Sequence, residues 1–169
     1  PDPSNRRSYT VRSISRDRKG NFWFGTRGGI YLYTPGSGVI STFAHDEREV
    51  HSLSGNSVLD IFHDARGDTW IGTRTGINYL VHSKQAFSNF RAMPGDNRYL
   101  NNNEVWAFWV DPGGKLWIGT EEGGVNIYDP VSRQFQYLTF QPGVQHTLTS
   151  NCIKHFMDDG QGNLWIATY

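Results

Sequence analysis

Two tryptophans are the side chains of this sequence best suited to binding a ligand. Trp106 and Trp109 depart from a pattern that recurs about every 47 residues, and the equivalent positions hold different side chains, several of them small or charged. Tryptophan presents a large apolar ring that stacks on the C–H surface of a sugar at low entropy cost. Tighter packing in the interior of the fold is the alternative, and it applies more strongly to Trp109 than to Trp106.

Three loop side chains form a second group of candidates. His51, Arg98 and His146 each lie five residues before an asparagine that recurs with the same pattern. Further polar and aromatic residues lie near them in the sequence, namely Asp46, Asp96, Asn97 and Tyr99. Hydrogen-bond donors beside aromatic rings suit a carbohydrate, including an acidic one. The alternative for each of these residues is an ordinary solvated loop side chain.

Metal and disulfide chemistry are not expected. The six histidines form no His-x-x-x-His or His-x-His pair, and none accompanies a serine or cysteine nucleophile motif. Cys152 is the only cysteine, which excludes an intrachain disulfide and a cysteine metal cage. We therefore predict no metal site and no cofactor.

The charge balance argues against one class of partner. Sixteen Lys and Arg residues balance sixteen Asp and Glu residues, so the formal net charge is zero. A protein that neutralises a phosphate backbone carries a basic surface. Nucleic acid is therefore not an expected partner.

The recurring pattern divides the sequence into four units. A tryptophan recurs at spacings of 47, 47 and 48 residues, and an aspartate, a glycine and an asparagine recur with it. The repeated residues are Trp23, Trp70, Trp117 and Trp165; Asp17, Asp64, Asp111 and Asp159; Gly20, Gly67, Gly114 and Gly162; and Asn56, Asn103 and Asn151. A side chain that recurs in every unit serves the structure, so we interpret these as structural residues.

Each unit is predicted to contain four short strands. The aspartate that begins the first turn caps backbone amides, and the glycine three residues later takes the φ > 0 position that closes the hairpin. The strands predicted in the second unit are Val58–His63, Thr69–Thr73, Ile77–Val81 and Phe87–Phe90, and the equivalent fourth strands of its neighbours are Val39–Phe43 and Phe135–Leu138.

Radially repeated units of this kind are typical of a β-propeller. The predicted fold class is therefore all-β, with three complete four-stranded antiparallel blades and the first two strands of a fourth. A parallel β-helix is the alternative, but its rungs are shorter and lack hairpins. In a propeller the loops that carry His51, Arg98 and His146 gather around one mouth of the central channel, where a rigid scaffold supports binding.

The repeat also gives boundaries. We expect one partial propeller domain, in which residues 1–8 are an N-terminal extension, 9–55 blade 1, 56–102 blade 2, 103–150 blade 3 and 151–169 the first half of blade 4. Propellers close with typically about 4 to 8 blades, so two apolar end faces need cover. The expected partners there are further blades of a longer parent chain or a second copy of this chain.

Catalysis would require a second acidic or basic group beside Glu104. Glu104 is an acid where the equivalent residues are Ser57 and Cys152. A hydrolase or lyase needs two carboxylates, or a histidine with an acid, restricted to one or two blades. We therefore predict no catalytic residue, and we retain Glu104 as a ligand-binding candidate.

The repeat resembles a known family. The third unit, from Asn103 through Trp117-Ile118-Gly119-Thr120 to Tyr128, is similar to the two-component regulator propeller repeat, and Ser52-Leu53 and Thr147-Leu148 match its lead-in. The resemblance implies a segment of a seven-bladed propeller from the periplasmic sensor region of a hybrid two-component histidine kinase of Bacteroides-like bacteria. It also implies binding of a glycan-derived oligosaccharide and regulation of polysaccharide utilisation.

The resemblance further implies that this segment is not an enzyme, although the parent protein can carry histidine kinase activity. A propeller enzyme acting on a glycan, as lyase or hydrolase, and a structural protein-interaction platform are the alternatives. The sequence contains no signal peptide and no apolar run of membrane-spanning length, so a periplasmic location and a lack of direct membrane contact follow from the resemblance alone.

Overall fold

The computed structural model describes residues 10–81, 87–93 and 95–169. Within these ranges the chain forms fourteen strands and no helix, which confirms the predicted all-β fold. It follows that no helix in this part of the chain could cross a membrane. The N-terminal extension expected over residues 1–8 lies outside the described residues.

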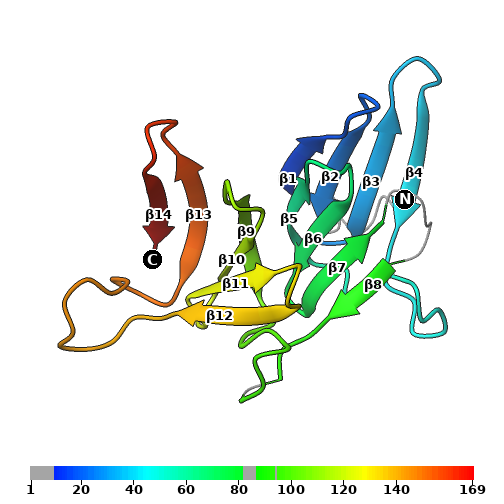
Figure 1. Cartoon of the computed structure of the whole chain (residues 1–169). Coiled ribbons are helices and arrows are strands. Elements are labelled where there is room, and N and C mark those ends of the chain that lie inside the picture. The colour runs from blue at the N-terminus through cyan, green and yellow to red at the C-terminus, as the bar shows by residue number, and fades with distance from the viewer. Residues whose placement is uncertain (1–9, 82–86, 94) are drawn as a thin grey trace. The chain divides into compact units, whose positions relative to one another are not determined.

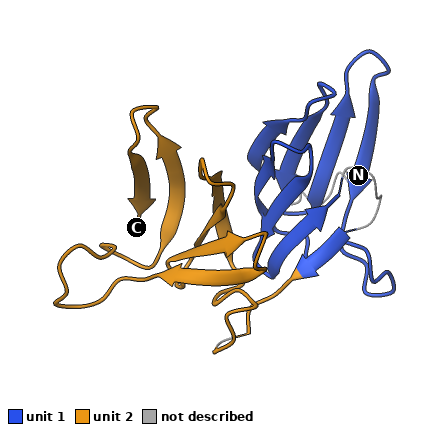
Figure 2. Ribbon diagram, viewed as in Figure 1, with its two compact units in different colours: residues 1–89 blue, residues 90–169 orange. Residues whose placement is uncertain are grey.

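The chain divides into two compact units, and the first spans Pro1–Asn89 (Figure 2). It contains two antiparallel sheets in which four consecutive strands pair in chain order, the last strand ending at the unit boundary (Figure 1). The strands are β1 (Val11–Arg16), β2 (Phe22–Thr26), β3 (Gly29–Thr34) and β4 (Val39–Phe43), then β5 (Val58–His63), β6 (Thr69–Thr73), β7 (Gly76–Leu80) and β8 (Phe87–Phe90). Each sheet is a propeller blade.

The second unit spans Phe90–Tyr169 and contains one four-stranded blade and one two-stranded sheet (Figure 2). The strands are β9 (Val105–Val110), β10 (Leu116–Thr120), β11 (Val125–Asp129) and β12 (Gln134–Leu138), then β13 (Ile153–Asp158) and β14 (Leu164–Thr168). The two-stranded sheet is the predicted beginning of a further blade.

The strand boundaries agree closely with the sequence pattern. Strands β4, β5, β6 and β8 have the predicted limits, and β12 begins one residue earlier than predicted. Strand β7 lies one residue earlier than predicted, because Gly76 already pairs with Thr73 of β6. The antiparallel ladder thus extends up to the turn, which the apolar pattern alone did not reveal.

The repeated aspartate closes the first hairpin of each blade. In the first blade Asp17 Oδ1 accepts hydrogen bonds of 2.9 Å from the backbone N–H groups of Lys19 and Asn21, and Gly20 has a φ of 84°. The other carboxylate oxygen, Oδ2, accepts a 3.0 Å bond from Nε1 of Trp23. The same aspartate–tryptophan bond is found for Asp64 with Trp70 and for Asp111 with Trp117. One side chain therefore fixes both the turn and the orientation of the ring.

The repeated asparagine joins the end of one blade to the start of the next. Asn56 Oδ1 accepts a 2.7 Å hydrogen bond from the His45 N–H, and the Asn56 carbonyl accepts one of 2.8 Å from Gly29 N–H of β3. Asn103 and Asn151 accept equivalent bonds from Ala92 and Phe140. These bonds hold the long connection after each outer strand against the fold.

The blades of each unit pack through apolar side chains around a repeated glycine. In the first unit a Cβ on Gly25 would lie 2.7 Å from Val58 Cγ1 of β5, and in the second a Cβ on Gly119 would lie 2.6 Å from Ile153 Cγ2 of β13. The two cores are Trp23, Ile30, Leu53, Val58, Ile61, Ile71 and Phe87, and Ala107, Val125, Ile127, Ile153 and Phe156. The glycines thus allow the neighbouring sheets to come into contact.

Candidate functional site

Trp106 lies at the start of β9 and is partly exposed. The ammonium group of Lys154, the second residue of β13, lies 3.8 Å from the centroid of the Trp106 ring. A cation at this distance over an indole face is attracted by the negative charge of the π-system. Residues about one repeat apart in sequence therefore form one contact.

Lys154 also forms an ion pair and a hydrogen bond with Glu121, which follows β10. The two side chains are 30% and 35% exposed, respectively, so both can reach a ligand from solvent. The hydrogen bond from Lys154 lowers the pKa of Glu121 below its ordinary value against the opposing effect of desolvation. Glu121 is therefore an anion near neutral pH.

The backbone fixes where these groups meet. In the pairing of β9 with β10, Gly119 pairs with Ala107 and Thr120 pairs with Val105, so Trp106 is the unpaired, bulged residue of β9. The N–H of Glu121 then donates a 3.0 Å hydrogen bond to the carbonyl of Glu104. We call Trp106, Glu121 and Lys154 the Trp106 site, and Glu104 adjoins it through this backbone bond.

The Trp106 site combines three kinds of recognition. Its ring offers an apolar surface, its ammonium donates hydrogen bonds, and its carboxylate accepts them. The opposite charges compensate each other, so the site suits a neutral polar ligand as well as a charged one. Hydroxyl groups beside a C–H face, as in a sugar ring, match this set.

Trp109 lies in a different environment although it belongs to the same strand. Its ring centroid is 5.6 Å from that of Trp117 in an edge-on arrangement, and it packs against the core formed with Ile153 and Phe156. The structure thus places Trp109 in the packing between the two sheets of the second unit, apart from the polar groups around Trp106.

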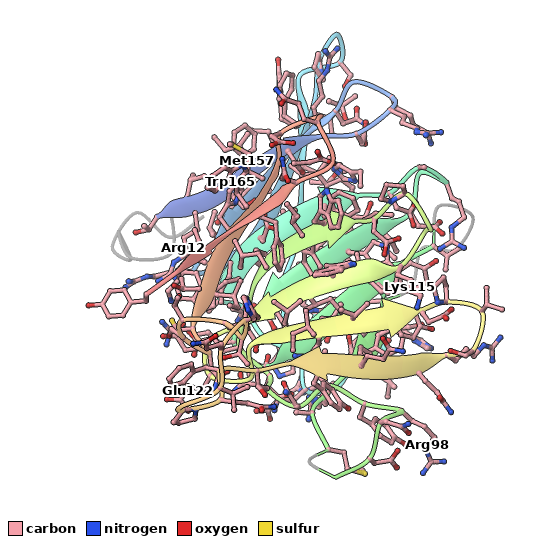
Figure 3. All side chains as sticks on the ribbon, turned by 60° about the vertical axis from the view of Figure 1, so that its left-hand side comes forward. Arg12, Arg98, Lys115, Glu122, Met157 and Trp165 are labelled. Carbon is pink, nitrogen blue, oxygen red and sulfur yellow. The ribbon has the colours of Figure 1, made fainter. Side chains whose placement is uncertain are left out.

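Arg98 and Tyr99 form a separate group on the exposed loop between β8 and β9 (Figure 3). The Arg98 guanidinium pairs with the carboxylate of Asp96 at 2.6 Å and lies 5.8 Å from the centroid of the Tyr99 ring. The hydrogen bonds from Arg98 lower the pKa of Asp96 to about 2. The Tyr99 carbonyl accepts a 2.8 Å bond from the Tyr137 hydroxyl of β12, which ties the loop to its blade.

The two candidate histidines lie on exposed loops in different units. His51, in the first unit, donates its backbone N–H to Glu49 Oε1 at 3.1 Å. His146, in the second, has a left-handed φ of 63°, which marks a tight turn. Among the described residues, no group of three or more His, Cys, Asp or Glu side chains is arranged to hold a metal ion.

Sequence reasoning missed Glu121 and Lys154, although both carry a recognisable feature. Lys154 occupies the position equivalent to Trp106 in the next sequence repeat. Glu121 lies in the turn Thr120–Val125, which is one residue longer than the corresponding turns of the first two units. The inserted residue beside Glu121 therefore marked this turn as unusual in the sequence. The contact of Lys154 with Trp106 and Glu121, which joins the third and fourth sequence repeats, could only come from the fold.

A family model described as two component regulator propeller matches residues 5–28, 52–75 and 147–169. Each matched segment contains the first two strands of one sequence repeat, namely β1–β2, β5–β6 and β13–β14. No curated protein matches the chain.

Several solved structures have the same fold. The extracellular domain of a hybrid two-component system from Bacteroides thetaiotaomicron is 23% identical with a TM-score of 0.78, over 94% of this chain and 22% of that one. Virginiamycin B lyase from Staphylococcus aureus is 11% identical with a TM-score of 0.68, over 97% of this chain and 50% of that one. PorZ of the Porphyromonas gingivalis type-IX secretion system is 19% identical with a TM-score of 0.60, over 94% and 24%.

The structural similarity to these proteins supports the propeller fold. At such low sequence identity it shows no shared activity. The chain spans half or less of the length of each of these structures.

Proposed function

Since the chain belongs to the two-component regulator propeller family, we propose that it is part of the periplasmic sensor propeller of a hybrid two-component histidine kinase. Its repeats and its likeness to an extracellular domain of such a system support this proposal. In this role the segment binds a signal molecule, and the kinase lies elsewhere in the parent protein.

The ligand we propose is an oligosaccharide released from a complex glycan, so that the parent regulates polysaccharide utilisation. The observation that carries this proposal is the contact of Trp106 with Lys154 and of Lys154 with Glu121. These three side chains differ from their counterparts in the other units, so the repeat does not require them. Glu104 and the loop residues His51, Arg98, Tyr99 and His146 stay candidates for further ligand contacts.

We propose binding without turnover. A glycoside hydrolase needs one carboxyl group that holds a proton near neutral pH and a second that is ionised. The lowered pKa of Glu121 makes it unsuited to donate a proton. A propeller lyase or hydrolase is the alternative function, and such an enzyme would convert the oligosaccharide into a reaction product.

The chain also needs a partner for one sheet face, which we propose is a further blade of the parent or a second copy of this chain. Met157 of β13 and Trp165 of β14 are paired neighbours and are 58% and 63% exposed (Figure 3). The equivalent tryptophan of the first blade, Trp23, is only 5% exposed, because its ring packs between two blades. The exposed Met157–Trp165 face therefore has the character of an interface.

Calorimetry of this chain with a panel of neutral and acidic oligosaccharides tests the proposed function. For a sugar that binds, Trp106→Ala should weaken binding about tenfold, which corresponds to roughly 1.4 kcal/mol and is the scale of one aromatic contact. Trp106→Phe keeps an aromatic ring and should restore part of the affinity.

Trp165→Ala is the matched control, because it removes an exposed tryptophan from another strand. Equal losses in Trp106→Ala and Trp165→Ala would argue against the Trp106 site. Product formation would support an enzyme, and a lack of binding across the panel would favour a structural interaction platform.

A further inference from the structure

The first unit contains a pocket between its two blades, apart from the Trp106 site. It has a volume of about 570 Å³ and is lined by the hairpin that joins β1 to β2, the hairpin that joins β5 to β6, and residues of β3, β4 and β7. Pockets of roughly 300–1,000 Å³ accommodate small molecules. The size of this pocket therefore fits a ligand rather than a single ion.

The rim of the pocket is cationic. Arg18, Lys19 and Arg66 line it, and Asp17 is the acidic lining residue. Asp17 is ionised and already engaged, because it accepts hydrogen bonds from two backbone amides, the Asn21 side chain and the Trp23 indole. Among the lining residues, three cations thus accompany one carboxylate.

Two of these cations are available to a ligand. Arg66 already pairs with Asp64 at 3.4 Å and with Asp68 at 3.9 Å. Over the described ranges neither Arg18 nor Lys19 forms an ion pair. The stem of Arg18 reaches the second hairpin, since a Cβ on Gly67 would lie 3.8 Å from Arg18 Cδ.

The fold does not require these cations. At the positions of Arg18 and Lys19 the third hairpin has Pro112 and Gly113, and the fourth has Gly160 and Gln161. All four hairpins keep the aspartate and the glycine that close the turn. The positive charge is therefore a property of this pair of blades and not of the repeat.

The pocket also has an apolar wall, and the polar residues Asn21 and Thr69 complete its lining. Trp23, Leu32, Phe43 and Leu80 line the pocket, and the rings of Trp23 and Phe43 stack with centroids 6.0 Å apart. The residue equivalent to Leu32 in the second blade is Tyr79, whose ring lies 4.1 Å from that of Trp70. The smaller leucine leaves room beside the tryptophan of the first blade.

We propose that this pocket binds an organic anion, with a carboxylate or sulfate group held by Arg18 and Lys19 and an apolar ring held against Trp23, Leu32 and Phe43. Guanidinium and ammonium groups form strong charge-assisted hydrogen bonds with such oxygens. The apolar walls bind the ring through the hydrophobic effect. The ligand is thus amphipathic, unlike the sugar proposed for the Trp106 site, and this inference does not depend on that site.

The proposal is tested by measuring the binding of 2-naphthoate to this chain by calorimetry. Two comparison compounds are 2-naphthylmethanol, which has the same rings without the charge, and glucuronate, which is an anion without an apolar ring. We expect 2-naphthoate to bind at least about tenfold more tightly than either comparison compound, and its affinity to fall with added salt. Equal affinity for the uncharged probe would overturn the role of the cations. Tighter binding of glucuronate would overturn the role of the apolar walls, and a lack of 2-naphthoate binding would overturn the proposal.

Two variants locate the site. The double change Arg18→Ala and Lys19→Gln should weaken 2-naphthoate binding about tenfold or more, and Leu32→Tyr should abolish it by filling the space as Tyr79 does in the second blade. Arg48→Gln removes a cation from the exposed loop after β4 and should leave the affinity unchanged. If the affinity of the double variant matches that of the original chain, the anion binds elsewhere.

Discussion

At the scale of single residues, the two tryptophans that break the repeat differ in what they contact. Trp106 and Trp109 both break it, and the structure separates them: Trp106 meets a lysine and a glutamate, whereas Trp109 packs against Trp117. The two side chains are three positions apart on one strand, so alternation alone would place them on opposite faces. In a propeller both faces of a blade are packed, and only the neighbouring sheet decides what each tryptophan contacts.

His63 provides a pH-dependent contact between the blades of the first unit. Its Nε2 lies 3.0 Å from Ser15 Oγ of the neighbouring blade, its Nδ1 lies 3.0 Å from Thr69 Oγ1, and its ring meets Trp23 edge-on. Burial lowers the pKa of His63 below its ordinary value of 6.5, although Asp17 and Asp64 oppose this shift. The folded chain therefore keeps this imidazole neutral at a pH where the unfolded chain protonates it.

We predict that this histidine makes the chain less stable in mild acid. Below pH 6.5 the unfolded state binds more protons than the folded state, so the unfolding free energy falls as the pH drops towards the lowered pKa and is fully retained above 6.5. Thermal unfolding followed at pH 7.5 and pH 5.5 should show a smaller pH-dependent loss of Tm in His63→Gln than in the original chain. His146→Gln, on an exposed loop, is the control and should keep the original profile; identical behaviour of the two variants would disprove the assignment.

At the scale of strands and sheets, the contact between neighbouring blades depends on a missing side chain. Gly25 and Gly119 each face a β-branched residue on the first strand of the next sheet. These residues are Val58 of β5 and Ile153 of β13. The fourth sequence repeat has Ala167 at this position, and Ala167 is exposed. At Gly25 and Gly119 the absence of a Cβ therefore allows the neighbouring sheet to approach closely.

Gly119→Ala should therefore destabilise the second unit by about 1–3 kcal/mol, as overpacking of a core does. The added Cβ would lie 2.6 Å from Ile153 Cγ2 and 3.3 Å from Phe156 Cε2, so the sheets must move apart. Urea unfolding followed by tryptophan fluorescence measures the change. Ala167→Gly tests the equivalent exposed position and should change stability by less than about 1 kcal/mol; a similar loss in both variants would show that the cost lies in the strand and not in the contact between sheets.

At the scale of the whole molecule, large apolar side chains are exposed on the first and the last sheet of the chain. Met157 and Trp165 are exposed side by side on β13 and β14. In the first sheet of the chain, Ile14 of β1 is 63% exposed. Its counterpart in the next sheet, Ile61, is 4% exposed and packs in the core of the first unit. Trp165 and Ile14 thus occupy positions whose counterparts, such as Trp23 and Ile61, are buried where two blades meet.

We predict that the chain self-associates through the Met157–Trp165 face when it is studied by itself. Sedimentation over a range of concentrations should show association, and the double change Met157→Ser and Trp165→Ser should raise the dissociation constant at least about tenfold, because two large apolar side chains leave the interface. Val131→Ser is the control, since Val131 is exposed on the turn after β11 and away from the sheet face. A monomer at every concentration would contradict self-association and leave the blades of a parent chain as the proposed partner.

The sequence by itself determined the blades. The Asp-x-x-Gly turn, the strand alternation and the 47-residue spacing are local features, and the hydrogen bonds they predict, such as those of Asp17 with Lys19 and Asn21, form within a few residues. Local structure of this kind follows from the backbone preferences of a short segment.

Only the tertiary structure decided where the candidate ligand sites lie. Lys154 reaches Trp106 across two sheets, and Arg18 and Arg66 line one pocket although a full repeat separates them. The repeat predicts that neighbouring blades stack, but not which side chains of two stacked blades meet. That depends on small differences in side-chain volume and turn length, such as Leu32 in place of a tyrosine and the extra residue beside Glu121.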